Sequence, residues 1–144
     1  MTADGPAHLD RKLAYGVFRL SLGINLLIHG ANRFLGPGVD AFSSKTTTEF
    51  AGTPLPAVLV RAFLTVVPFA EFILGGLITL GLFLRWALTL GGLLIVALIF
   101  GTALRGDWTI VGIQMIYAIT YYLLLLNRAD NAFSLDALFR VDRE

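Results

Sequence analysis

The chain contains no cysteine and only two histidines, His8 and His29, among its 144 residues. Without thiols it cannot form disulfides, thiolate metal sites or cysteine-ligated iron–sulfur clusters, and it has no thiol nucleophile. Charged residues are also scarce, at 15% of the chain, compared with about 25% in an ordinary soluble domain. Because the net charge is only +1 and no basic run is present, no nucleic-acid partner is expected.

Apolar residues are correspondingly abundant. They make up 56% of the chain, and the mean hydropathy is +0.76. This balance suits a protein whose solvent is mostly lipid, and the length predicts a single domain over residues 1–144. The first residues, MTADGPAHLDRK, lack the apolar core of a signal peptide. We therefore expect the first apolar segment to remain and to span the membrane.

Four segments are long and apolar enough to cross a bilayer, which takes about 20 residues of helix. They cover residues 13–34, 57–84, 86–104 and 109–127. The links around Arg85 and over residues 105–108 are short, so neighbouring spans must run antiparallel. The sequence thus predicts an all-α fold, an antiparallel four-helix transmembrane bundle.

Two shorter helices are expected outside the spans. Between the first two spans, residues 35–55 place Phe42 and Phe50 near one helical face, which predicts a short amphipathic helix on the membrane surface. A plain surface loop is the alternative. Near the C-terminus, Ser134 is suited to cap a short helix over residues 135–141.

Basic residues predict the orientation. With the N-terminus inside, six face the cytoplasm and four face the other side, with Arg19 set aside: Arg11, Lys12, Arg85, Arg128, Arg140 and Arg143 against Arg33, Lys45, Arg61 and Arg105. This excess favours cytoplasmic termini in an inner (plasma) membrane. Trp86 and Trp108 begin the third and fourth spans, as interfacial anchors do.

Small residues predict where the helices pack closely. The second and third spans carry Gly75, Gly76, Gly91, Gly92 and Gly101. Since lipid supplies no hydrophobic drive between helices, close approach at such residues holds a membrane bundle together. We expect the second and third spans to be the most intimate pair. A ligand path lined by glycines is the alternative.

Arg19 and Glu71 are the ionisable residues set deepest in the predicted spans. A charge at membrane depth costs about 2.5–3.5 kcal/mol on insertion scales, so each marks a candidate functional site. The two antiparallel spans put them at similar depths, and we expect an ion pair that fixes helix register. There are two alternatives. The residues could take a direct part in proton or quinone chemistry, or Glu71 could be protonated and only hydrogen-bonded.

Further polar residues follow helical spacing. Asn25, His29 and Asn32 share one face of the first span, and Gln114, Tyr117 and Tyr121 share one face of the fourth. Ordinary packing with satisfied hydrogen bonds explains such residues, and a quinone head-group site is the alternative. A haem with two histidine ligands is not expected, because His8 lies outside the span, and no metal site is predicted. The candidate polar cluster is Arg19, Asn25, His29, Glu71, Gln114, Tyr117 and Tyr121.

Three stretches carry a family resemblance. Residues 19–23 read RLSLG and are followed by His29-Gly30 and Arg33; residues 68–71 read PFAE and run into Gly75-Gly76 and residues 80–82; residues 50–56 read FAGTPLP. In this pattern, which covers roughly residues 15–100, the chain resembles the DoxX-like membrane protein family. That family is grouped with the small subunit of thiosulfate:quinone oxidoreductase.

The resemblance implies a four-helix membrane bundle associated with oxidoreductases and quinones. We therefore expect an accessory or anchor subunit of a quinone-linked redox complex, with lipid and other membrane subunits, or further copies of the chain, as partners. A quinone-reactive subunit with its site around Arg19, His29 and Glu71 is the alternative. A small oligomeric transporter is a further alternative. Quinone is the one cofactor that the resemblance suggests.

Overall fold

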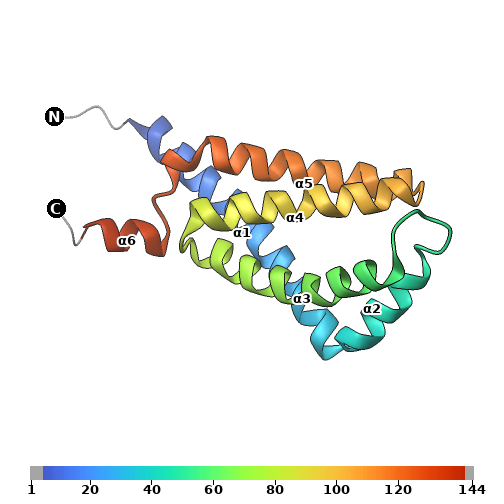
Figure 1. The fold of residues 1–144 in the computed structure, drawn as a ribbon. Helices are drawn as coiled ribbons and strands as arrows, with labels where there is room; N and C mark the ends of the chain where they lie inside the picture. Colours follow the sequence, from blue (N-terminus) through green and yellow to red (C-terminus); the bar gives the residue numbers. More distant parts are fainter. Residues whose placement is uncertain (1–4, 142–144) are drawn as a thin grey trace.

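The computed structural model describes residues 5–141, so Arg143, which was counted for the orientation, lies outside the described part. It consists of helices joined by short turns, with no strand among the described residues. In chain order the helices are α1 (Pro6–Leu35), α2 (Val39–Thr48), α3 (Ala57–Leu80), α4 (Leu84–Leu104), α5 (Trp108–Leu126), the 3-10 turn η1 (Arg128–Asp130) and α6 (Leu135–Val141). Both ends of the chain lie at one end of the bundle, and α2 lies at the other (Figure 1).

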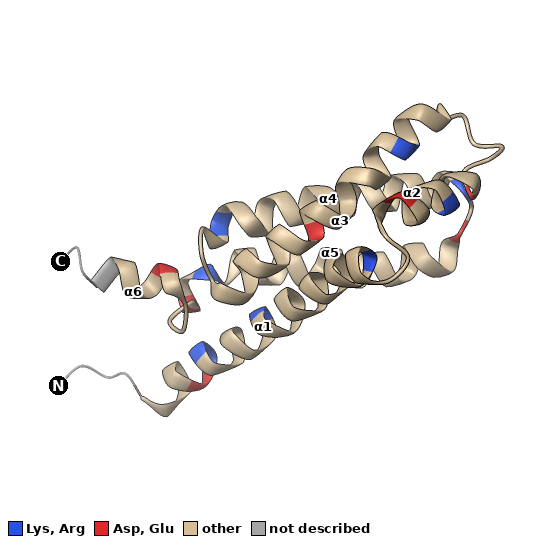
Figure 2. Cartoon of the chain, turned by 90° about the horizontal axis from the view of Figure 1, so that it is seen from below, with Lys and Arg blue, Asp and Glu red and all other residues tan. Residues whose placement is uncertain are grey.

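Four of these helices, α1, α3, α4 and α5, are long and apolar enough to cross a membrane. Their outer surfaces expose large apolar side chains, among them Val58, Trp86 and Ile116. Charged residues lie mostly toward the two ends of the bundle (Figure 2). The chain is a multi-pass helical membrane protein, as its composition predicts.

The tightest helix pair is α1 with α3. A Cβ added to Gly75 would lie 2.3 Å from the backbone nitrogen of Leu27, and one added to Gly30 would lie 2.5 Å from that of Phe72. Gly23 meets the backbone of Thr79 in the same way. The expectation that the second and third spans form the closest pair is therefore wrong. The bare face of Gly75 is turned toward the first span, a direction that spacing along one helix does not reveal.

The other close pair is α4 with α5, which lie side by side (Figure 1). Here Gly91 makes room for the ring of Tyr121, since an added Cβ would lie 2.5 Å from it. Gly101 lies against the ring of Phe50, at 3.3 Å from an added Cβ. At Gly76 and Gly92 an added Cβ would make only ordinary contacts, so these two glycines are not needed for close approach.

The turn between α3 and α4 differs from the predicted break at Arg85. α3 ends at Leu80 because Gly81 adopts a left-handed conformation, with φ of 67°, that closes the helix. The N–H of Leu82 then bonds the carbonyl of Leu77, a common way for a helix to end at glycine. Arg85 therefore lies in the first turn of α4. The second span is shorter than expected and the third begins earlier.

Both predicted short helices are present. α2 occupies the link between the first two spans, and α6 covers residues 135–141. The Ser134 hydroxyl oxygen accepts a hydrogen bond from the Ala137 N–H at 3.2 Å, as a cap residue should. In α6, the Asp136 carboxylate accepts bonds from the N–H groups of Phe83 and Leu84, each 2.9 Å long. The C-terminal segment thus caps the start of α4.

Candidate functional site

Arg19 is buried at the end of the bundle that holds the termini. Its guanidinium donates to the carbonyls of Ile78 at 2.5 Å and Thr79 at 2.6 Å, in the last turn of α3. It also donates to the carbonyl of Phe133 at 2.7 Å, in the segment that leads to α6. A helix C-terminus leaves its last carbonyls without partners and carries partial negative charge, so an arginine is a good cap there. Arg19 joins three segments of the chain.

Glu71 pairs with Arg33 rather than with Arg19. The Glu71 side chain is 5% exposed and the Arg33 side chain 24%. The expected Arg19–Glu71 pair is therefore wrong. The two residues are too far apart along the axis of α3 to pair. The carbonyl of Ile78, which Arg19 binds, lies seven residues beyond Glu71, or about 10 Å at 1.5 Å per residue. Once Arg19 caps that end of α3, the carboxylate is left to an arginine nearer the other end of α1.

A polar contact joins α1 to α5 near Glu71. The Tyr117 hydroxyl donates to the Asn25 side-chain oxygen at 3.2 Å, and His29 Nδ1 lies 3.0 Å from the Asn25 carbonyl oxygen. Glu71 interacts electrostatically with His29 and Tyr121 as well as with Arg33. Of the seven candidate residues, the structure gathers Asn25, His29, Glu71, Tyr117 and Tyr121. Arg19 and Gln114 lie elsewhere.

A groove of about 380 Å³ runs along the same face of α1. Asn25 and His29 are exposed in it, as the sequence spacing predicted for one face. Its lining residues are Asn25, Ile28, His29, Asn32, Arg33 and Pro37. The groove thus combines amide, imidazole and guanidinium groups along one face of a spanning helix.

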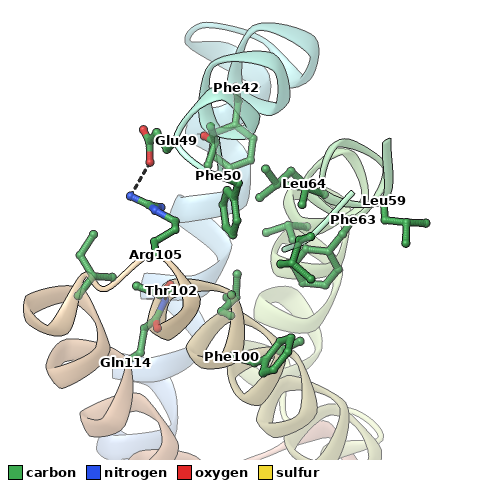
Figure 3. A pocket seen from close by; sticks show the side chains of 18 of the residues that line it. Phe42, Glu49, Phe50, Leu59, Phe63, Leu64, Phe100, Thr102, Arg105 and Gln114 are labelled. Carbon is green, nitrogen blue, oxygen red and sulfur yellow. Dashed lines mark hydrogen bonds and ion pairs between the residues drawn. The ribbon is translucent and has the colours of Figure 1, made fainter. Parts of the chain in front are cut away.

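A second and more apolar chamber of about 430 Å³ lies toward the α2 end, between α2, α3, α4 and the start of α5. Phe42 and Phe50 of the α2 segment line one side of it. Its other walls include Phe63 and Leu64 of α3 and Phe100 of α4 (Figure 3). Pockets that bind small ligands are commonly about 300–1,000 Å³ and mostly apolar with a few placed polar groups. The chamber has these properties.

Polar groups of the chamber come from α1, the α2 segment, the end of α4 and α5. Arg105, at the end of α4, pairs with Glu49 at 2.8 Å and lies over the Phe50 ring at 5.2 Å (Figure 3). On α5, Gln114 donates through Nε2 to the Thr102 hydroxyl at 3.1 Å. The Gln114 Oε1 atom is buried and has no hydrogen-bond partner within residues 5–141. Such an atom is costly to leave unpaired and calls for an explanation.

The arginines of the chamber are already neutralised. Arg33 stacks at 4.2 Å over the Phe42 ring and holds Glu71, while Arg105 holds Glu49 and lies 3.8 Å from Asp107. An anionic head group would have to compete with these carboxylates. The chamber therefore suits an uncharged ligand with hydrogen-bonding atoms and a hydrocarbon portion.

Sequence reasoning missed most of this chamber. Arg105 was counted only for orientation, and Arg33 only for orientation and as a basic residue after His29. The signal that was available is the aromatic face of the 35–55 segment, whose Phe42 and Phe50 each stack on one of these arginines. No group of three or more His, Asp or Glu suited to a metal occurs in the described residues.

No protein-family model, curated protein or solved structure matches the chain. The resemblance to DoxX-like proteins rests on the motifs of residues 19–33, 50–56 and 68–82 alone.

Proposed function

We propose that this protein is an accessory membrane subunit of a quinone-linked redox assembly and that the chamber holds the quinone. The observation that carries the proposal is the apolar chamber at membrane depth, with Gln114, Thr102 and two charge-neutralised arginines as its polar groups. A quinone presents uncharged carbonyl or hydroxyl oxygens on a ring and a long hydrocarbon tail. Its head group could hydrogen-bond with Gln114 or Arg105, and its ring could lie against Phe50 and Phe63.

The alternative quinone site around Arg19, His29 and Glu71 is less favoured. Arg19 donates to three backbone carbonyls at the opposite end of the bundle through its two terminal nitrogens. A head group there would have to break these bonds before it could meet Arg19. The chamber requires no such rearrangement, and it opens among apolar side chains that suit the tail.

Quinone binding can be tested by filling the chamber. Ala97 lines it, whereas the neighbouring Val96 is exposed on the outer face of α4. We expect the purified protein in nanodiscs to bind a short-tailed ubiquinone analogue, and Ala97→Phe to abolish that binding while Val96→Phe leaves it intact. Equal binding by both variants, with unchanged thermal unfolding, would place the quinone elsewhere and contradict the assignment.

The accessory role can be tested by identifying the proteins that copurify with the chain. Purification from its native membrane in mild detergent, followed by mass spectrometry, should recover a partner that carries redox centres. The apolar outer face of α5, including Ile113 and Ile116, is a surface that such a partner or lipid can cover. Recovery of a monomer or homo-oligomer that alone exchanges electrons between quinone and a soluble donor would overturn the accessory role.

The proposed orientation places the termini in the cytoplasm and the α2 end outside, in the plasma membrane. The basic residues on the two sides support it, and both termini do lie at one end (Figure 1). Since the chain has no cysteine of its own, Ala51→Cys and Asn127→Cys report cleanly on the two ends. An impermeant thiol reagent should label position 51 in intact cells and position 127 only after lysis. The reverse pattern would invert the topology.

A further inference from the structure

The groove along α1 descends deep into the membrane. Its inner end is the Asn25–Tyr117 contact, and Tyr117 lies nine residues after Trp108, the first residue of α5. At 1.5 Å per residue this depth is about 14 Å, close to the middle of a hydrocarbon core that is about 30 Å thick. The outer end is at Asn32 and Pro37, beside the α2 end of the bundle. The groove therefore spans nearly half of the membrane.

Polar atoms of the groove are left without protein partners. Within the described residues, Asn32 makes no side-chain hydrogen bond, and His29 uses only its Nδ1 atom, which bonds within α1. Both residues are exposed on the same face of α1 as Asn25. Unpaired amide and imidazole groups are strongly disfavoured in hydrocarbon, where no water can hydrogen-bond them. Water satisfies such groups where a recess is polar and large enough, and the 380 Å³ groove meets both conditions.

The wall of the groove leads to the buried carboxylate. Arg33 lines both the groove and the chamber, and its guanidinium pairs with Glu71. The titratable and charged groups that interact with Glu71 are Arg33, which pairs with it, and His29 of α1 and Tyr121 of α5, which interact with it electrostatically. A solvent path along the groove would thus end at the one carboxylate buried in the spanning part of the described chain.

We propose that this groove is a hydrated inlet, through which water from the α2 side of the membrane reaches the Arg33–Glu71 pair. The inlet lets Glu71 exchange protons with the solution on that side through His29 and intervening water. Its use for the protons of a bound quinol rests on the proposed function, whereas the inlet itself does not.

Single cysteines test the inlet in this cysteine-free chain. Methanethiosulfonate reagents attack the thiolate, which forms in water and not in hydrocarbon. With a cationic methanethiosulfonate and the protein in nanodiscs, Asn32→Cys, His29→Cys and Asn25→Cys should react at rates within about tenfold of Ala51→Cys. Two outward-facing controls of equal depth, Ile24→Cys beside Asn25 and Ile116→Cys beside Tyr117, should react at least about 100-fold more slowly.

A blocked inlet supplies the second measurement. Asn32→Trp at the groove mouth should slow the labelling of Asn25→Cys at least about tenfold, while Leu35→Trp, on an exposed position of the same helix end, should not. Labelling of Asn25→Cys as slow as Ile116→Cys, in a protein with unchanged thermal unfolding, would overturn the inlet. Quinone plays no part in either labelling measurement. A failure of quinone binding at the chamber can therefore be told apart from a failure of the inlet.

Discussion

The two ends of the bundle are built in opposite ways. At the end that holds the termini, side-chain hydrogen bonds and ion pairs join one segment to another. At the α2 end, the helices separate around a chamber of about 430 Å³, and a groove of about 380 Å³ follows one face of α1. The comparison indicates that close fastening at one end allows the other end to keep open space without loss of the fold.

The fastened end depends on contacts between distant parts of the chain. Arg19 holds the last turn of α3 and the C-terminal segment, and Asp136 caps α4. The Tyr15 hydroxyl donates to the carbonyl of Leu124 at 2.9 Å, and Arg11 pairs with Asp130 at 3.0 Å. Each contact satisfies a helix end or joins α1 to the residues after α5.

The open end uses a different chemistry. Its arginines, Arg33 and Arg105, each pair with a carboxylate and lie over one aromatic ring of the α2 segment. The α2 segment is flanked by Gly38 and Gly52, both with positive φ and with open space around them. These contacts position α2 over the chamber and leave the interior beneath it unfilled.

The largest effect is expected from Arg19→Leu. This change removes a charge-assisted donor from three carbonyls, and each buried acceptor left unpaired costs about 1–3 kcal/mol. We expect a loss of about 4 kcal/mol in the free energy of unfolding, measured by denaturant titration in detergent micelles. Arg61→Leu is the control, because its ion pair with Asp40 is largely exposed and should contribute under about 1 kcal/mol. Equal losses for the two variants would show that the hydrogen bonds of Arg19 stabilise the fold no more than an exposed ion pair does.

The second prediction concerns which arginine is coupled to Glu71. Glu71→Leu should cost about 3 kcal/mol by leaving Arg33 without its partner, and adding Arg33→Leu should restore part of that loss. In a double-mutant cycle, Arg33 and Glu71 should therefore be strongly non-additive. Arg19 and Glu71 should be additive, because they lie in separate networks. Coupling of Glu71 to Arg19 instead would contradict the structure.

The third prediction uses adjacent glycines. Gly75→Ala places a Cβ 2.3 Å from the Leu27 backbone and forces α1 from α3, whereas Gly76→Ala finds 4.0 Å to a Leu27 side-chain atom. Overpacking of this kind costs about 2 kcal/mol, so thermal unfolding should drop for the first variant only. A stabilising or neutral Gly75→Ala would show that the helices are farther apart.

The smallest effect is expected from Asp136→Ala. Loss of a carboxylate cap at a helix N-terminus costs about 1 kcal/mol, and here the capped helix, α4, is far from α6 in sequence. Asp10→Ala is a matched control, since Asp10 makes no contact of this kind within residues 5–141. Hydrogen exchange at Phe83 and Leu84 should rise only in the first variant. Unchanged exchange at Phe83 and Leu84 would show that Asp136 does not cap α4.

Sequence alone determined the membrane setting and the helices. Runs of about 20 apolar residues have few ways to satisfy their backbone in lipid, so the four spans followed from composition. The helix over Val39–Thr48 and the Ser134 cap were also readable, because both depend on local spacing. The shared face of Asn25, His29 and Asn32 was predictable for the same reason.

Only the tertiary structure decided the partners. Glu71 had two arginines on α1 within plausible reach, and Arg19 was taken by the end of α3 and by Phe133. Gly75 had two possible neighbours, and its bare face turned to α1. Arg105 and Glu49 became a pair because α2 folds back over the end of α4. Periodicity fixes which residues share a helix face, but the rotation and tilt of each helix fix what that face meets, and these come from packing against neighbours.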